Sequence, residues 1–378
     1  MPKLMVIAGE ASGDLHGGNV ITRLKKQMPD LELFGTGGQL LESAGCKIYY
    51  RVEDLAVIGI WEVAKRYGYY KGIFNEMVAL LDSEKPDAVF LVDYAGFNLK
   101  FAKEAKKRGI KVIFYIAPQV WAWKKNRIKK IKAYVDELIV LFPFEVEWFQ
   151  AEGMVAHCFG HPLLDIAKPS RPRAEVLESI GLSPAHSTLA ILPGSRENEI
   201  IKHLPMLVPA IDLIHEKAID IQFVYPVAPT VNIDRVAEFF KNSKAKVVLD
   251  QGHTYDIVAA CDLAMVASGT ATLETAILET PLLIFYKVTK ATNWIGRNIL
   301  KLGAIGLPNI IAKKTIVPEL IQHDFSPESL AKKVLSSFDD PHLLSKMKKD
   351  LRKLKEELGE TGGYDRTADF VKNSLETL

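Results

Sequence analysis

The stretch that decides the fold is LAMVASGTATLETAIL, residues 263–278. A short apolar run, Leu263 to Ala267, leads through small hydroxyl residues and a glycine into a segment compatible with a helix. A strand followed by such a turn and a helix is the repeating unit of α/β folds. The start of the helix exposes backbone N–H groups at the positive end of the helix dipole, and these groups bind phosphate. An ordinary capped core helix is the alternative.

Similar apolar runs recur along the chain, each followed by a longer helix-compatible segment. They are continuous rather than alternating, which favours parallel strands buried on both faces. The predicted strands are Leu4–Ala8, Leu31–Phe34, Ala88–Val92, Lys111–Ile116, Leu138–Phe142, Val155–Phe159, Leu189–Leu192, Ile221–Tyr225, Val247–Leu249, Leu263–Ala267 and Leu282–Tyr286. This repetition predicts an α/β fold with two Rossmann-like, doubly wound domains facing a central cleft.

The length of 378 residues suggests two domains. A polar stretch punctuated by prolines places the boundary between Gly160 and Pro184. We expect an N-terminal domain over residues 1–165 and a C-terminal domain over residues 166–349. Residues 350–378 are expected to form an amphipathic helix that packs on the domains, with the C-terminal helices crossing back to the N-terminal domain.

The composition excludes several classes of protein. A formal charge of +2 gives no global electrostatic signal for nucleic acid. Three widely spaced cysteines provide neither metal-ligand spacing nor a disulfide framework, as expected for a reducing cytoplasm. No uncharged apolar run is long enough to span a bilayer. No Asp-x-Asp pair occurs, so we expect neither a metal nor a cofactor.

Two loops in the N-terminal half carry carboxylates directly after predicted strands. Residues 9–18, GEASGDLHGG, follow the first strand, and their glycines allow close backbone approach to a ligand. The loop contains Glu10 and Asp14, and either Ser12 or Asp14 is suited to capping the next helix. Asp93 follows another buried strand, where it is a candidate general base or, alternatively, a helix N-cap.

A tryptophan-rich loop, APQVWAW at residues 117–123, follows a further strand. Trp121 beside Gln119 is typical of a stacking and hydrogen-bonding surface, and six Lys or Arg residues lie within 124–132. Aromatic side chains interleaved with bases suggest an anionic partner, which could be a phosphorylated ligand, an acidic lipid surface or nucleic acid. Core tryptophans beside a solvated helix face are the alternative.

In the C-terminal half, LPGSRENE at residues 192–199 follows the first predicted strand. Its Pro-Gly pair makes a tight turn, Ser195 is expected to cap a helix, and Arg196 can clamp a diphosphate. With residues 268–274, one domain then supplies a cation and a helix N-terminus to one anion. Glu274, one turn into its helix, can reach the hydroxyls of a ribose. These residues predict a site for a nucleotide diphosphate, in which the negative charge of the leaving group is stabilised without a metal.

Together these motifs resemble the lipid-A-disaccharide synthase family of GT-B glycosyltransferases. The Trp-Ala-Trp and SGTATLE stretches are highly specific, and the matches run nearly end to end. The matching segments are GEASGD (9–14), LAVIG (55–59), Glu62-Val63, PQVWAW (118–123), LPGSR (192–196), SGTATLE (268–274), LPN (307–309) and VPELIQ (317–322).

The resemblance implies a reaction. A 2,3-diacylglucosamine unit passes from its UDP donor to the 6-hydroxyl of 2,3-diacylglucosamine 1-phosphate, forming a β-1,6 disaccharide and releasing UDP. Because an α-linked donor gives a β product, the reaction inverts and requires one base. Asp93 matches the first carboxylate of the family's Asp-Ala-Pro-Asp-Phe-Asn-like loop, whereas Gly96 replaces the second. Glu10 is the second candidate base.

The resemblance also implies site residues. Those expected to bind UDP or border the donor site are Arg196, Ser268, Gly269, Thr270, Glu274, Asn309, Glu319 and Gln322. Those expected to line the substrate loops are Ser12, Asp14, Gln119 and Trp121. Some family members exchange C-terminal segments between two subunits, so a homodimer is one implied assembly.

Acylated substrates require access to a bilayer, and residues 57–81 provide a candidate surface. The side chains expected to face the membrane are Val57, Ile60, Trp61, Tyr67 and Phe74. Neighbouring bases such as Lys71 would favour an anionic leaflet. We therefore expect a cytoplasmic protein bound peripherally to the inner face of the inner membrane of a Gram-negative type bacterium. A buried amphipathic helix is the alternative.

Two other functions remain compatible with the sequence. A UDP-sugar epimerase on the same scaffold would share the diphosphate site but would need neither an acceptor nor a membrane face. A non-catalytic module that binds anionic lipid or nucleic acid through residues 121–132 would leave Arg196 and residues 268–274 without a role.

Overall fold

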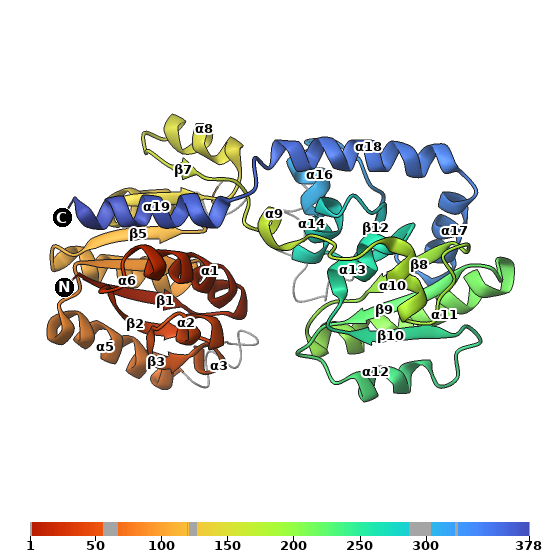
Figure 1. The fold of residues 1–378 in the computed structure, drawn as a ribbon, viewed down its shortest axis with the longest axis horizontal. Helices are drawn as coiled ribbons and strands as arrows, with labels where there is room; N and C mark the ends of the chain where they lie inside the picture. Colours follow the sequence, from red (N-terminus) through yellow and green to blue (C-terminus); the bar gives the residue numbers. More distant parts are fainter. Residues whose placement is uncertain are drawn as a thin grey trace. The chain divides into compact units, whose positions relative to one another are not determined.

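The computed structural model describes residues 2–55, 67–118, 120, 127–286, 304–321 and 324–377. The chain divides into two units: unit 1 comprises Met1–Asp165 with Leu358–Leu378, and unit 2 comprises Ile166–Glu357. Each unit contains one parallel sheet with helices on both faces (Figure 1). The prediction of two doubly wound α/β units is therefore confirmed.

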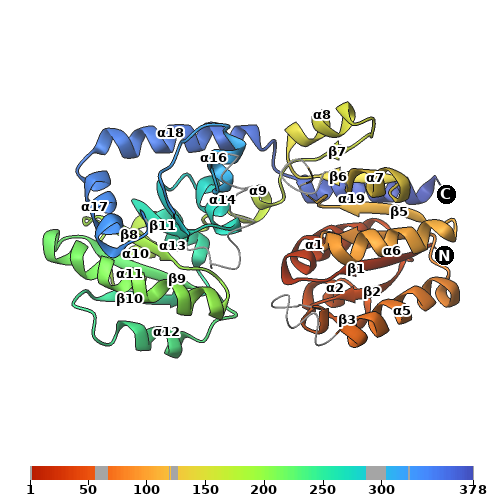
Figure 2. The same cartoon turned by 180° about the vertical axis from the view of Figure 1, so that it is seen from behind.

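Unit 1 is built on a seven-stranded sheet with the order β3-β2-β1-β4-β5-β6-β7. Helices α1 and α19 lie side by side on one face, and α5, α6 and α7 cover the other (Figures 1 and 2). The strands are β1 (Lys3–Ala8), β2 (Glu32–Gly37), β3 (Lys47–Arg51), β4 (Ala88–Val92), β5 (Lys111–Tyr115), β6 (Glu137–Val140) and β7 (His157–Cys158). The helices are α1 (Ala11–Gln27), α2 (Gln39–Ser43), α3 (Val52–Leu55), α5 (Tyr67–Glu84), α6 (Ala95–Lys107), α7 (Arg127–Tyr134), α8 (Pro143–Ala151), α9 (Leu163–Ile166) and α19 (Gly363–Glu376).

Unit 2 is built on a six-stranded sheet with the order β10-β9-β8-β11-β12-β13. Helices α11, α12 and α17 pack on one face through an apolar core that includes Leu204, Val236 and Val334. The strands are β8 (Thr188–Leu192), β9 (Gln222–Val227), β10 (Val247–Gln251), β11 (Leu263–Ala267), β12 (Leu282–Tyr286) and β13 (Glu319–Ile321). The helices are α10 (Arg173–Ser179), α11 (Glu197–Lys217), α12 (Ile233–Phe240), α13 (Thr254–Ala260), α14 (Thr270–Ile277), α16 (Leu307–Ile311), α17 (Pro327–Phe338) and α18 (Pro341–Glu357).

The C-terminal segment is divided between the two units. Helix α18 continues without a break to Glu357 and buries Met347, Leu351 and Leu354, so residues 350–357 belong to unit 2 rather than to a separate element. The expected return to the N-terminal domain is made by α19, which packs on α1. Polar contacts line this pair, including His16 Nδ1 with Tyr364 Oη at 2.7 Å.

Within the described ranges, no helix is long and apolar enough to cross a bilayer.

Candidate active site

In each unit, two of the predicted loops follow the strands at which the strand order of the sheet reverses, whereas the predicted loop 117–123 follows β5. In unit 1 this point lies between β1 and β4, which pair from Leu4–Ala88 to Ala8–Val92. In unit 2 it lies between β8 and β11. Open α/β sheets bind ligands beyond the carboxyl ends of the strands at this point. The sheet topology therefore supports a ligand site at each of these two loop pairs.

Asp93 occupies a strained turn directly after β4. Its φ is 47°, and that of the next residue, Tyr94, is 46°, so two successive non-glycine residues are left-handed. Such conformations cost about 1–3 kcal/mol each and persist only where their surroundings enforce them. The N-cap of α6 is Tyr94 rather than Asp93, so the alternative interpretation of Asp93 as a helix cap is wrong.

The environment of Asp93 suits a general base. Burial, and to a smaller extent the negative charge of Glu10, raise the pKa of Asp93 to about 6, although a hydrogen bond from the Tyr94 backbone opposes both effects. Glu10 itself is exposed at the N-cap of α1. A carboxylate with a pKa close to neutral can accept a proton efficiently at physiological pH. Of the two candidates, Asp93 is therefore the better suited.

This arrangement predicts a pH dependence. Asp93 must be ionised to accept a proton, so activity should fall as the pH falls through about 6. Glu10→Gln removes a charge that raises the pKa of Asp93, so the acidic limb of the kcat profile should move to lower pH. Glu104→Gln makes the same charge change on α6, near its C-terminal Lys107, and should leave the limb in place. If the acidic limb of the kcat profile is unchanged in Glu10→Gln, the charge of Glu10 does not raise the pKa of Asp93.

Asp14 has a structural role that the sequence did not predict. Its buried carboxylate accepts the backbone N–H groups of Gly38 at 2.7 Å and Leu41 at 3.1 Å. It therefore caps α2 and not its own helix, in which both Asp14 and the exposed Ser12 lie within the first turns. The expectation that either residue caps α1 is wrong. Asp14 therefore links the first turn of α1 to the start of α2.

The start of α14 in unit 2 is open to a ligand. Its N-cap, Gly269, makes no side-chain cap, and the first turn carries no acidic residue. Gly269 and Thr270 are exposed, whereas Ser268 is half-buried, with its Oγ 3.3 Å from Ile305 O. An uncapped helix N-terminus with exposed backbone offers N–H groups to an anion. The absence of a side-chain cap favours an anion site over an ordinary capped helix for α14.

Glu274 is held one turn into the same helix. Its Oε1 accepts a hydrogen bond from Tyr255 Oη on α13 at 3.0 Å. Burial raises the pKa of Glu274, and the Tyr255 hydrogen bond opposes that effect. The carboxylate is thus oriented by a neighbouring helix, as a hydrogen-bonding group for ligand hydroxyls requires.

The start of α11 is closed, in contrast to that of α14. Glu199 Oε2 accepts the backbone N–H groups of Ser195 at 3.2 Å and Arg196 at 3.4 Å, so Glu199 caps the helix and the expected Ser195 cap is wrong. The Arg196 guanidinium pairs with Glu199 at 3.2 Å and its side chain is 67% exposed. This loop can therefore bind an anion through the charge of Arg196 and not through the backbone N–H groups of α11.

We expect Arg196→Ala to weaken UDP binding by about 10- to 100-fold, because a hydrogen bond to a charged group contributes about 1.5–3 kcal/mol. Calorimetric titration with UDP measures the change. Arg235→Ala removes another exposed arginine of unit 2, one that pairs with Glu197, and should leave UDP affinity unchanged. Equal affinity in the wild type and Arg196→Ala would remove Arg196 from the site.

Asn309 and Glu319 organise the loop beside α14. The Glu319 carboxylate accepts the N–H groups of Ile305 at 2.9 Å and Gly306 at 3.0 Å, and the amide of Asn309 at 2.7 Å. Asn309 also accepts the N–H groups of Ile316 and Val317. Their polar atoms thus stabilise the segment whose Ile305 carbonyl lies against Ser268. This geometry indicates that Asn309 and Glu319 position the donor site rather than contact the ligand.

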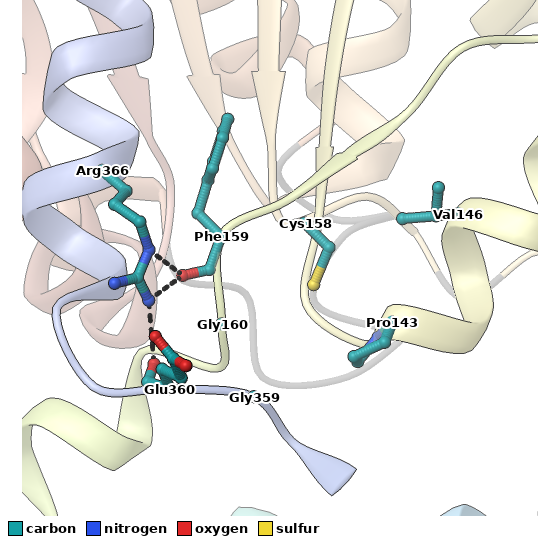
Figure 3. Close-up of a pocket in the computed structure, with 8 residues that line it drawn as sticks. All are labelled: Pro143, Val146, Cys158, Phe159, Gly160, Gly359, Glu360 and Arg366. Atoms are coloured by element: carbon teal, nitrogen blue, oxygen red, sulfur yellow. Dashed lines mark hydrogen bonds between the residues drawn. The ribbon is translucent and has the colours of Figure 1, made fainter.

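A hollow of about 380 Å³ in unit 1 is lined by no residue of that unit's β1–α1 and β4–α6 loops. It is lined by Pro143, Val146, Cys158, Phe159, Gly160, Gly359, Glu360 and Arg366 (Figure 3). Arg366 directs its guanidinium to the carbonyls of Phe159 and Glu360. Its donors therefore hold the returning C-terminal chain against the residue that follows β7, which is a structural role.

Several predicted site residues lie outside the described residues: Val57, Ile60, Trp61, the side chain of Tyr67, Gln119, Trp121 and Gln322. Phe74 is described and is partly buried in the core of unit 1. Its ring packs edge-on against Phe97 and Phe101, with centroids 5.3 and 6.2 Å apart. For Phe74, the alternative of a helix packed on the core describes the environment better than a membrane-facing position.

Three residues of these loops were missed in the sequence. Tyr94 and Tyr255 contact residues of other elements. A single sequence gives no signal for such contacts. Glu199 was missed because the N-cap is Arg196 and Ser195 lies four residues before Glu199, so the Ser-x-x-Glu signature of a capping box is absent.

Taken together, the two doubly wound units and the ligand loops at their switch points define a GT-B fold. Solved structures agree at this level. The chain aligns over 99% of its length with MurG from Acinetobacter baumannii, covering 100% of that chain, with TM-score 0.61 and 13% identity. CalG4, the calicheamicin glycosyltransferase, aligns with TM-score 0.63 and 13% identity over 100% of this chain and 98% of its own. The UDP-GlcNAc 2-epimerase from Neisseria meningitidis aligns with TM-score 0.61 and 12% identity over the whole of both chains.

Sequence comparison distinguishes among these enzymes. The family model described as Lipid-A-disaccharide synthetase matches residues 4–373. The lipid-A-disaccharide synthase of Syntrophus aciditrophicus is 40% identical over 97% of this chain and 96% of its own. That of Persephonella marina is 39% identical over 98% and 99%. The chain therefore belongs to the lipid-A-disaccharide synthase family and is a glycosyltransferase, which disfavours the epimerase and the non-catalytic alternatives.

Proposed function

We propose that this protein transfers 2,3-diacylglucosamine from UDP-2,3-diacylglucosamine to the 6-hydroxyl of 2,3-diacylglucosamine 1-phosphate. The products are the β-1,6-linked disaccharide 1-phosphate and UDP. The observation that carries the proposal is that a chain of this family has both an uncapped helix N-terminus after β11 in unit 2 and a half-buried carboxylate with a raised pKa after β4 in unit 1.

In the proposed mechanism, Asp93 accepts the proton of the acceptor hydroxyl as that oxygen attacks the anomeric carbon. The bond between the anomeric carbon and the diphosphate breaks on the opposite side, which inverts the configuration. The N-terminus of α14 and the guanidinium of Arg196 stabilise the negative charge that develops on the departing UDP. Glu274 binds the ribose hydroxyls.

Acceptor-dependent release of UDP tests this function. The purified protein is offered UDP-diacylglucosamine with and without the monosaccharide 1-phosphate, and both UDP and the disaccharide are quantified. The proposal requires both products, in equal amounts, only when the acceptor is present. Release of UDP from the donor alone would indicate hydrolysis or another reaction instead.

We also propose that the protein binds the cytoplasmic face of the inner membrane peripherally. The proposed substrates carry acyl chains, and α5 exposes 49% of Tyr69 beside Tyr70 and Lys71. Aromatic rings next to a base suit an anionic lipid surface. Sedimentation with anionic and with neutral vesicles tests this idea. Tyr69→Ser should reduce binding to anionic vesicles, and equal recovery with both kinds of vesicle would contradict the proposal.

A further inference from the structure

Strained backbone is concentrated at the carboxyl ends of β4 and β5. Besides Asp93 and Tyr94, Ile116 has a positive φ of 64°, although a β-branched residue rarely adopts that conformation. The Asp93 N–H donates to Tyr115 O at 2.9 Å, which links the two strand ends. Such outliers persist only where neighbouring contacts enforce them. The contacts that enforce the Asp93 turn therefore bear on how its carboxylate is placed.

Asn98 makes those contacts from the first turn of α6. It is fully buried, and its Nδ2 lies 2.8 Å from Asp93 O and 3.2 Å from Val92 O. The same nitrogen lies 3.5 Å from Ile7 O on the adjacent strand β1. One amide thus joins the carbonyls at both strand ends of the switch point in unit 1. These contacts hold Asp93 by its main chain and leave its carboxylate to the substrate.

The acceptor atom of the same amide supports this assignment. Asn98 Oδ1 is buried and has no hydrogen-bond partner among the residues that the structure describes. Turning the amide over would place this oxygen against the carbonyls of Val92 and Asp93, so the donor end is fixed toward them. An unsatisfied buried acceptor is costly, and its retention requires a reason. Support of the strained turn supplies that reason.

We propose that Asn98 is a positioning residue for the transfer reaction: its side-chain amide holds the turn after β4 in the strained conformation that presents the Asp93 carboxylate to the acceptor hydroxyl. The proposal rests on the proposed function, in which Asp93 accepts the proton. Asn98 does not touch the reacting atoms. Its effect should therefore appear in kcat and in the titration of Asp93, and not in UDP affinity.

The test compares Asn98→Ala, which removes the donor, with Asn98→Ser, which retains a shorter one. Asn98→Ala should lower kcat by about 10²-fold, the scale expected when a reacting group moves by roughly 1 Å. The relaxed turn should also expose Asp93 and move the acidic limb of the pH profile to lower pH. Glu10 is the described titratable group that raises the pKa of Asp93, and the Tyr94 backbone N–H lowers it; both remain in these variants. Asn98→Ser should have an intermediate kcat.

Leu81→Ala provides the matched control. Leu81 is buried near the C-terminal end of α5, where Glu84 pairs with Lys3 at the start of β1, so it lies at the opposite end of the sheet from Asp93. This variant should lose stability while keeping its kcat and its pH profile. If Leu81→Ala loses as much kcat as Asn98→Ala for the same fall in melting temperature, or if Asn98→Ala keeps the wild-type acidic limb, the proposal is overturned.

Failure of the proposal is separable from failure of the proposed function. If the wild type makes no disaccharide, or if Asp93→Asn remains fully active, the proposed function or its base is wrong. If the wild type is active, Asp93→Asn is inactive and Asn98→Ala matches the wild type in kcat, only the positioning role is wrong. Should Asn98→Ala fail to fold, Asn98→Ser supplies the same comparison.

Discussion

Asp93→Asn should lower kcat by about 10²-fold or more while leaving UDP affinity unchanged and making the protein more stable at neutral pH. The loss in rate follows from removing the base, since general base catalysis contributes about 10²- to 10⁴-fold. UDP affinity is preserved because the nucleotide is expected to bind the loops of unit 2. The gain in stability follows from the environment of the carboxylate.

The sign of the stability change can be worked out from the raised pKa. The pKa of Asp93 is about 6 in the folded protein and 3.8 in the reference state, so the folded state binds the proton more tightly. The stabilisation due to this proton is present at low pH and is lost as the pH rises through about 6. At neutral pH the ionised Asp93 therefore destabilises the fold. Asparagine carries no charge and also tolerates the left-handed conformation at this position.

The control is Asp87→Asn, at the opposite end of the same strand. Asp87 precedes β4 and accepts the backbone N–H of Lys3 at 2.7 Å, so it lies at the amino end of the sheet. Both variants are assayed for kcat, for UDP affinity by calorimetry and for unfolding by urea. Asp87→Asn should keep full activity. An Asp93→Asn variant that turns over at nearly the wild-type rate would transfer the role of base to Glu10.

The sequence predicted the central strands because those strands are buried on both faces. Ala88–Val92, Leu263–Ala267 and Leu282–Tyr286 were predicted with the bounds that the structure gives them. Strands β3 and β13 were missed, and both lie at sheet edges with partly exposed residues. An edge strand needs no continuous apolar run, so hydrophobic patterning can miss it; the edge strands β7 and β10 do carry such runs and were predicted.

For the candidate site, the positions of the loops were predictable from the sequence, but the partners of their polar groups were not. Loops that follow central strands must lie at the carboxyl ends of the sheet, so the positions of Asp93 and residues 268–274 followed from the strand pattern. The partners of polar groups did not. Asp14 binds the start of α2, and Asn309 binds residues several positions further along the chain. Such pairings depend on how loops pack, which one sequence does not specify.

Gly269→Asp should weaken UDP binding by about 10²-fold and at the same time stabilise unit 2. Aspartate is among the best N-cap residues, and a carboxylate there interacts favourably with the helix dipole, so the gain should be about 0.5 kcal/mol. Gly269 can accept the side chain, because its φ of 166° is extended backbone and no atom lies within 4 Å of an added Cβ. The same carboxylate occupies the N–H groups and repels the diphosphate, which costs roughly the energy of one or two charged hydrogen bonds.

Two further substitutions at this position separate charge from blocking. Gly269→Ala adds a Cβ without capping the helix, so UDP affinity should stay close to that of the wild type. Gly269→Asn caps the helix without a charge, so its affinity should lie between those of the alanine and aspartate variants. Calorimetry with UDP and unfolding by urea measure the two effects. If Gly269→Asp gains stability yet binds UDP as the wild type does, the diphosphate does not lie at the start of α14. A glycine at this N-cap would then have no functional explanation, because a better capping residue fits there without strain.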